Sequence, residues 1–317
     1  MTLAIRVRQT GAPSVLVPEQ EEVGRPGPGQ VRLRQEAVGL NFVDTMFRSG
    51  AFPMPLPFVG GVSGAGEIVE LGAGVSDYKV GDRVAYCFAP GAYAEERLID
   101  TAPLVPLPAD VPADIAAGLL TKGITAWLAL HELYPAGPGG TVLVQGASGG
   151  VGSLIASWAK DMGATVIAVG SPAKLGRVAE IADHAIASDA PDLADRIRAA
   201  APDGVDVVYD LVGQATFAAS AAAVRTGGSI FTIGAASGQP KIDREALAAR
   251  RVQVAHASAA ATVTGTMLQR ATADVFAAWH RGVFGAIELQ GYPLADAARA
   301  HEDIAARRIG SHPILRP

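Results

Sequence analysis

A glycine-rich turn in the middle of the chain constrains the fold more than any other stretch of the sequence. Residues 145–152 read QGASGGVG, directly after an apolar strand pattern at 141–145 and at the start of a helix pattern at 151–162. Small residues here permit a tight turn and let backbone N–H groups approach a pyrophosphate, to which the helix N-terminus adds partial positive charge. The pattern therefore predicts a parallel α/β sheet of the Rossmann type with a dinucleotide at the turn, and a glycine-rich helix entry without a ligand is the alternative. The candidate cofactor-binding residues of the turn are Ala147, Ser148, Gly149, Gly150, Val151 and Gly152.

The end of the second strand indicates which dinucleotide binds. A site for NAD places Asp or Glu about 20 residues after the turn, where the carboxylate holds the ribose hydroxyls. Gly170 and Ser171 stand there instead, and Lys174 and Arg177 follow. Because no carboxylate at this place repels a 2′-phosphate, we expect the cofactor to be NADPH. The alternative is that Lys174 and Arg177 are solvated charges on a helix.

Strand patterns on either side of this unit predict two domains. Apolar runs at 205–210 and 228–234 are typical of strands in a sheet that is covered on both faces. The first part of the chain reads as short strands separated by turn signals, which favours a small curled β-barrel. We therefore expect an α/β protein with a first domain at 1–118, completed by 257–317, and a Rossmann domain at 119–256.

Composition excludes several classes of function. The chain has 317 residues, of which 49% are hydrophobic and 18% charged, as in ordinary globular proteins. Its net charge of -5 and its scattered basic residues argue against a nucleic-acid partner. Glycines, prolines and charges interrupt every apolar stretch, and no secretory signal stands at the start, so we expect no membrane span and a cytoplasmic location.

A metal site is not expected either. Cys87 is the only cysteine, which rules out an internal disulfide and a multi-cysteine zinc site. The six histidines are scattered, and we expect each to be a surface or packing residue rather than a ligand.

Several segments together resemble one family. They are VGLNFVDT at 38–45, VGDRV at 80–84, KGITA at 122–126, VYDLVG at 208–213 and ARAHE at 298–302, in addition to the glycine-rich turn. In these segments the chain resembles the quinone oxidoreductases, also called zeta-crystallins, which are zinc-independent medium-chain dehydrogenases/reductases. The likeness extends over essentially the whole chain. It implies a GroES-like β-barrel catalytic domain and a Rossmann NADP-binding domain, with the active site in the cleft between them.

The resemblance also implies roles for individual residues. Asn41, Asp44 and Thr125 would line the nicotinamide side of the cleft, and Lys174 and Arg307 would help to hold the cofactor. Gly234, which ends the strand run at 228–234, is a further cofactor-binding candidate. For Asn41 and Asp44, a capped turn before a helix is the alternative.

Three positions depart from the family pattern. Met46, Phe52 and Ser188 stand where relatives often carry tyrosines. The substitutions at 46 and 52 remove candidate phenol proton donors, and the one at 188 weakens a contact with the cofactor phosphate.

The reaction expected of such a chain is reduction of an electron-poor acceptor. Without a metal, oxidation of a simple alcohol lacks the Lewis acid that stabilises the alkoxide. We therefore expect hydride transfer from NADPH to a small-molecule quinone, with reduction of an α,β-unsaturated carbonyl or enoyl thioester as the alternative. A non-catalytic NADPH-binding protein is a second alternative. The apolar run at 228–234 further predicts a homodimer through an exposed sheet edge.

Overall fold

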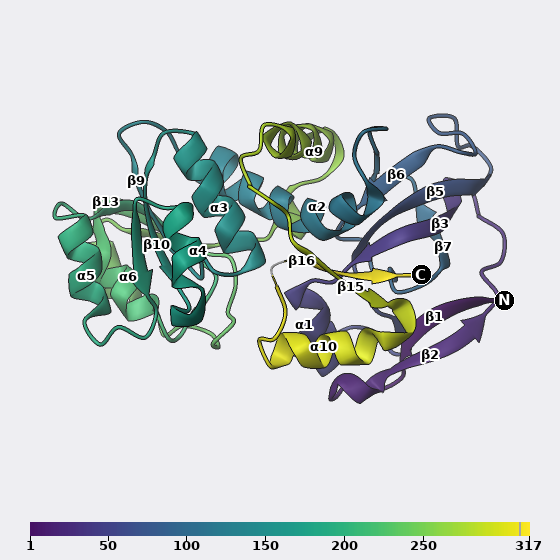
Figure 1. Cartoon of the computed structure of the whole chain (residues 1–317), viewed down its shortest axis with the longest axis horizontal. Coiled ribbons are helices and arrows are strands. Elements are labelled where there is room, and N and C mark those ends of the chain that lie inside the picture. The colour runs from purple at the N-terminus through teal and green to yellow at the C-terminus, as the bar shows by residue number, and fades with distance from the viewer. Residues whose placement is uncertain (311) are drawn as a thin grey trace. The chain divides into compact units, whose positions relative to one another are not determined.

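The chain folds into two units, and each has its own β-structure (Figure 1). The computed structural model describes residues 1–310 and 312–317. Unit 1 comprises residues 1–121, 264–273 and 287–317, and unit 2 comprises 122–263 and 274–286. The chain therefore changes units inside two helices, α2 (Ala113–Trp127) and α9 (Gly265–His280).

The assignment of all of 257–317 to the first domain needs a correction. Residues 257–263 and 274–286 belong to unit 2. The reason lies in the second half of α9, where Asp274 accepts a hydrogen bond of 2.8 Å from the Trp127 indole. A Cβ placed on Gly123 would lie 2.6 Å from the Val275 side chain, so α2 and α9 are in close contact within unit 2.

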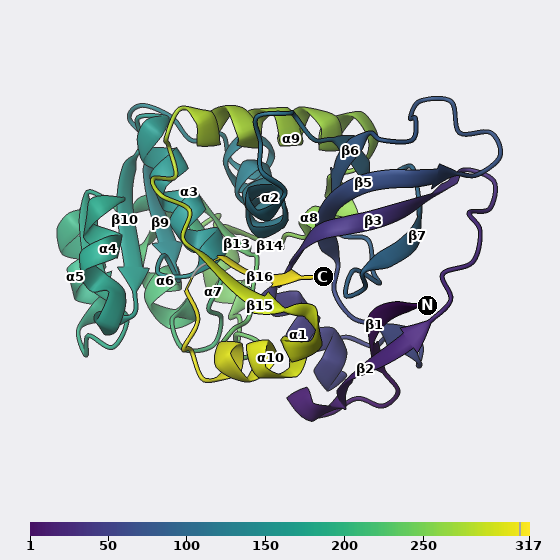
Figure 2. The ribbon, with the colours of Figure 1, turned by 45° about the vertical axis from the view of Figure 1, so that its right-hand side comes forward.

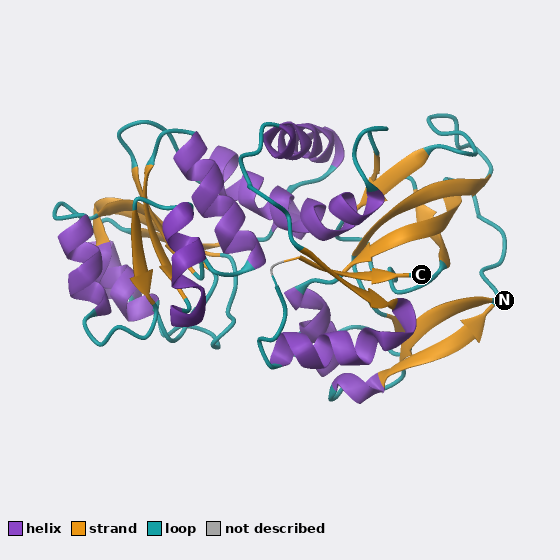
Figure 3. Cartoon of the chain, in the orientation of Figure 1, coloured by secondary structure: helices purple, strands orange, loops and turns teal. Residues whose placement is uncertain are grey.

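Unit 2 contains the predicted parallel sheet. Its six strands follow the order β11-β10-β9-β12-β13-β14, and every neighbouring pair is parallel. Figure 3 shows helices on both sides of these strands. The strands are β9 (Thr141–Gln145), β10 (Thr165–Gly170), β11 (His184–Ala187), β12 (Val205–Asp210), β13 (Val224–Thr232) and β14 (Gln253–His256). The helices are α3 (Gly150–Asp161), α4 (Leu175–Glu180), α5 (Leu193–Ala200), α6 (Phe217–Ala223), α7 (Arg244–Ala249) and α8 (Ala259–Thr262).

The central strands of this sheet are apolar because both of their faces are covered. Leu143 of β9 and Val208 of β12 are fully buried in one core with Ile167 and Ile230 from the neighbouring strands. Continuous apolar runs are the sequence pattern that such strands require.

The prediction that 228–234 forms an exposed sheet edge is wrong. Within the described chain, β13 pairs with β12 on one side and with β14 on the other, so the edge strand at this end of the sheet is β14. The run at 228–234 is apolar because it lies inside the sheet.

Unit 1 is mostly β-structure, as its turn-rich sequence predicts. Figure 2 shows the long strands β3 and β5 side by side, with the shorter β6 beyond β5. One sheet has the order β15-β16-β3-β5-β6-β8, with β7 also paired to β3, and a second has the order β2-β1-β4. The strands are β1 (Thr2–Val7), β2 (Leu16–Glu21), β3 (Gln30–Gly39), β4 (Phe58–Val59), β5 (Ser63–Leu71), β6 (Arg83–Tyr86), β7 (Glu96–Asp100), β8 (Leu104–Pro106), β15 (Leu289–Pro293) and β16 (His312–Arg316). Its helices are α1 (Phe42–Ser49) and α10 (Ala297–Ala305).

The carboxyl-terminal strands complete this unit. Leu315 of β16 pairs with Val38 of β3, and both are buried in the same core as Leu33 and Ile68. Between these two strands in the chain lies α10, whose His301 contacts Tyr93 in the site described below.

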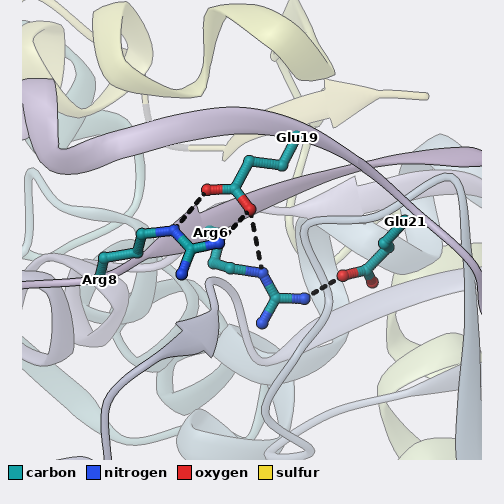
Figure 4. Close-up of polar contacts among 4 residues, drawn as sticks. All are labelled: Arg6, Arg8, Glu19 and Glu21. Carbon is teal, nitrogen blue, oxygen red and sulfur yellow. Dashed lines mark hydrogen bonds and ion pairs between the residues drawn. The ribbon is translucent and has the colours of Figure 1, made fainter.

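Ion pairs connect the side chains of the β1–β2 hairpin (Figure 4). The Arg8 guanidinium donates two hydrogen bonds of 2.9 Å to the Glu19 carboxylate, whose pKa these bonds lower. Arg6 contacts both Glu19 and Glu21. Opposite charges on facing strands favour one register of the hairpin.

One helical segment is a candidate membrane span by length and composition alone. Residues 113–133 are long and apolar enough to cross a bilayer by length and composition. However, 83% of the most apolar window is buried inside the protein. Core helices of globular proteins meet the same criterion, so the segment is weak evidence for a membrane span.

Candidate functional site

The glycine-rich turn connects β9 to α3 as predicted. Gly146 has a φ of +83°, which favours glycine, and its N–H and that of Ala147 donate to the Val169 carbonyl at 3.0 and 2.9 Å. A Cβ on Gly152 would lie 2.3 Å from the Gly146 carbonyl oxygen, so only glycine lets the helix begin this close to the strand. No side chain caps α3, and the first N–H groups of a helix have no partner within it. These features fit a dinucleotide pyrophosphate, which needs backbone donors and the positive end of a helix.

The end of β10 supports the turn from one side. Ser171 donates its N–H to Ser148 Oγ at 3.1 Å, which ties the end of the second strand to the turn. Ser188 donates its N–H to the Gly170 carbonyl at 2.8 Å, so it lies where this strand ends. The half-buried Lys174 and the exposed Arg177 follow, and residues 170 and 171 carry no carboxylate. The small, uncharged residues 170 and 171, followed by the cationic Lys174 and Arg177, fit a ribose 2′-phosphate.

The segment after β13 lies at the same edge of the sheet. Gly234 donates its N–H to the backbone carbonyl of Asp210, which ends β12, at 3.1 Å.

Thr125, on α2, also belongs to unit 2 and is half-buried. Unit 2 therefore contains all the predicted cofactor-binding residues except Arg307.

Asn41 and Asp44 come together in unit 1 at the start of α1. Asn41 is the N-cap, and the Asp44 carboxylate accepts its backbone N–H at 2.8 Å, as the third residue of a capping box does. The Asn41 carboxamide donates to Ser63 Oγ at 2.9 Å. Both residues are buried, with 5% and 3% exposed. The capping alternative therefore describes both residues, since the Asn41 side chain also accepts from the Asp44 backbone in the capping box, while its amide N–H binds Ser63 on β5.

Two further buried residues, Tyr93 and His301, belong to this cluster, and the sequence did not predict them as site residues. The Tyr93 hydroxyl donates to Asp44 Oδ2 at 3.1 Å and lies 2.9 Å from His301 Nε2. Because the phenol has one proton and gives it to the carboxylate, His301 must donate from Nε2. The chain of donors thus runs from His301 through Tyr93 to Asp44. His301 is fully buried, which agrees with its expected packing role.

Burial keeps the His301 imidazole and the Tyr93 phenol of this cluster neutral. Burial, with a smaller contribution from the Arg48 charge, lowers the pKa of His301 to about 3. Burial and the nearby Asp44 carboxylate raise the pKa of the Tyr93 phenol well above its usual value. No sequence pattern predicts the contact between Tyr93 and His301, because the two residues are 208 positions apart.

Arg307 lies in unit 1, just after α10. It is exposed, its φ is +56°, and its N–H donates to the Ile304 carbonyl at 3.0 Å. Its role toward the cofactor stays a prediction.

Metal ligands do not gather in the part of the chain that the structure describes. No group of three or more His, Cys, Asp or Glu residues is placed to hold a metal ion there. Cys87 is buried, and burial raises the pKa of its thiol.

Comparisons with known proteins agree with this two-part organisation. Residues 27–109 match the alcohol dehydrogenase GroES-like domain, and residues 150–275 match the zinc-binding dehydrogenase domain. The chain is 37% identical to a 2-haloacrylate reductase of Burkholderia sp, over 99% of each protein. It is 35% identical to a quinone oxidoreductase of Pseudomonas aeruginosa over the full length of both. The structure of the Escherichia coli quinone oxidoreductase complexed with NADPH superposes with a TM-score of 0.95 at 31% identity, over 99% of this chain and all of that one.

Proposed function

The chain belongs to the zinc-independent quinone oxidoreductase family of medium-chain dehydrogenases/reductases, and on this basis we propose that it reduces a quinone with NADPH. The observation that supports this most is the glycine-rich turn beside a second strand that ends in Gly170 and Ser171, on a chain similar over its full length to quinone oxidoreductases. NADPH would supply the hydride from its nicotinamide C4.

The residues of the chain would bind and align the reactants. The turn at 147–152 would hold the pyrophosphate through backbone N–H groups, with Gly170, Ser171 and Gly234 lining the same edge. Lys174, Arg177 and Arg307 would pair with cofactor phosphates. Water would deliver the proton, since Met46 and Phe52 have no hydroxyl.

Asn41 and Thr125 would orient the nicotinamide carboxamide or the substrate carbonyl. Both side chains form hydrogen bonds without adding charge to the site. The bond from Asn41 to Ser63 fixes the carboxamide on β5, and Asp44 fixes the turn that carries it. Alignment of this kind would account for most of the rate enhancement.

A second candidate function is reduction of an activated carbon–carbon double bond. The observation that favours it is the 37% identity to a 2-haloacrylate reductase. A haloacrylate and a quinone both present an electron-poor carbon conjugated to a carbonyl, so one hydride geometry serves both.

An NADPH-oxidation assay with quinones, enones, 2-haloacrylates and enoyl thioesters tests these alternatives. Turnover of quinones above the others is the expected result. Preference for alkenes would replace the main proposal by the second. If no substrate is turned over while NADPH binds, the chain is a non-catalytic NADPH-binding protein.

We further propose that the chain is a cytoplasmic homodimer. A single buried cysteine fits a reducing compartment. The dimer would form through β14, one of the two edge strands of the parallel sheet, because a sheet edge is a template for another copy.

A further inference from the structure

We propose that Asp210 positions the cofactor-binding edge of unit 2 and thereby sets the affinity for NADPH. It would act through the backbone around it rather than through contact with the cofactor. The inference rests on the NADPH-dependent function proposed above and concerns a residue outside the predicted site.

Asp210 joins two segments at the carboxyl end of β12. Its side-chain Oδ1 accepts the N–H groups of Val212 and Gly213 at 2.8 and 2.9 Å, which shapes the turn after the strand. Its backbone carbonyl accepts the N–H groups of Ile233 and Gly234 at 2.8 and 3.1 Å. One residue thus fixes both the turn at 211–213 and the start of the segment that contains Gly234.

The turn at 211–213 lies directly against the dinucleotide turn. Leu211 donates its N–H to the Gln145 carbonyl at 3.3 Å. A Cβ on Gly146 would lie 3.1 Å from Val212 Cγ2, so the two turns are in close contact. Any displacement of Val212 is therefore transmitted to the backbone that would hold the pyrophosphate.

The side chain is placed at an energetic cost. Asp210 is fully buried, and burial raises the pKa of its carboxyl against the opposing effect of the Gly213 and Val212 N–H groups. Its Oδ2 and the Oε1 of Gln145, its neighbour in register on β9, have no hydrogen-bond partner in the described chain. A buried carboxylate with an unpaired oxygen is unfavourable. The hydrogen bonds from the two N–H groups of the turn are the interactions that offset the cost of burying the Asp210 side chain.

Asp206 provides a matched control on the same strand. It lies toward the amino end of β12, where its Oδ2 accepts the Thr141 N–H at 2.6 Å and its Oδ1 accepts Arg225 Nε at 2.6 Å. It therefore braces β9 and β12 at the end opposite to the dinucleotide turn. Its loss should weaken the fold without moving the cofactor-binding edge.

The experiment compares full-length Asp210→Ala, Asp210→Leu, Asp210→Asn and Asp206→Ala with wild type. Kd for NADPH is measured by titrating the nucleotide fluorescence, and Tm is measured in parallel. We expect Asp210→Ala and Asp210→Leu to raise Kd about tenfold, the equivalent of one or two lost hydrogen bonds. Asp210→Asn keeps an acceptor oxygen and should bind nearly as wild type does. Leu fills the buried volume, so this variant remains informative if the Ala variant does not fold.

Two results would overturn the proposal. One is an unchanged Kd in the Leu variant, and the other is an equal rise in Kd for Asp206→Ala, because that would reflect general loss of stability. Failure of wild type itself to bind NADPH would instead refute the proposed function. The two failures are thus distinguishable.

Discussion

At the scale of single residues, Lys174 is the residue on which cofactor choice should depend most. It follows the end of β10, where its N–H donates to the Ser171 carbonyl at 2.9 Å. A charge-assisted hydrogen bond to phosphate contributes about 1.5–3 kcal/mol, so Lys174→Ala should weaken NADPH binding roughly 10- to 100-fold. The lower end is expected, because Arg177 and Arg307 can share the phosphate. NADH affinity should barely change.

Fluorescence titration of both cofactors against wild type and variant measures this preference. Lys160→Ala is the control, since Lys160 lies in the last turn of α3 and its ammonium donates to the Ala182 carbonyl at 3.0 Å. Equal losses for NADH and NADPH in Lys174→Ala would show that the 2′-phosphate is not recognised there.

Asn41 should affect turnover more than cofactor affinity. Asn41→Ala removes a neutral hydrogen bond, which costs about 0.5–1.5 kcal/mol or up to roughly tenfold in rate, and more if alignment fails. Steady-state kinetics and NADPH titration separate the two effects. A fall in Tm with unchanged turnover would mean that Asn41 serves only as a helix cap.

His301 should make stability depend on pH. Its pKa of about 3 in the folded chain lies below the unfolded value of about 6.5. Between these values the unfolded chain binds a proton that the folded chain does not, so the free energy of unfolding falls as pH drops below about 6.5. From pH 7 to pH 5 this group alone should remove about 2 kcal/mol of stability.

Urea unfolding of His301→Gln at both pH values tests this dependence. Gln does not titrate and keeps an N–H donor for Tyr93, so its loss of stability between pH 7 and pH 5 should be about 2 kcal/mol smaller than that of wild type. The exposed His184→Gln is the matched control. Identical pH dependence in all three proteins would contradict the neutral, buried state of His301.

At the scale of elements, β14 determines whether copies of the chain associate through the parallel sheet. Ala255, in the middle of this edge strand, is exposed. Because a lysine on an edge strand opposes pairing with a second edge, Ala255→Lys should convert a dimer into a monomer. Sedimentation at micromolar concentration measures the change. A wild-type monomer, or a variant that stays dimeric, would exclude assembly through β14.

Elements with a local signal could be predicted from the sequence, and those defined by distant partners could not. The strands β9, β10 and β12 follow from apolar runs, and α3 follows from the glycines that open it. In contrast, β14 is four residues long and mostly exposed, so its sequence carries little strand pattern. Missing it made the run at 228–234 look like an edge.

The site shows the same division. Asn41 and Asp44 are three residues apart and could be found as a segment. Tyr93 reaches Asp44 from a distant loop whose backbone bonds to Ile5 and Gly60, and His301 joins the cluster from α10 through the Tyr93 hydroxyl. Asp210 lies in one of the segments that resemble the family. Its two hydrogen bonds to the following turn, however, could not be predicted from the sequence.

At the scale of the whole molecule, metal content is a direct test of family membership. The sequence has a single cysteine, and a zinc site in this architecture needs a cysteine, a histidine and a further cysteine, histidine or acid as ligands. We therefore expect elemental analysis of the purified protein to find no stoichiometric zinc. Chelators should leave NADPH oxidation unchanged. One tightly held zinc per chain would contradict the zinc-independent assignment.

The change of units inside α2 and α9 limits how this gene can be rearranged. A recombination event that transplanted residues 122–263 alone would leave behind 274–286, which belong to the same unit. The transplanted piece would then lack Asp274, the acceptor for Trp127, and Val275, which covers Gly123. Exchange of unit 2 between relatives should therefore succeed only when residues 122–263 and 274–286 come from the same parent. A crossover within 264–273 separates the two segments and would be selected against.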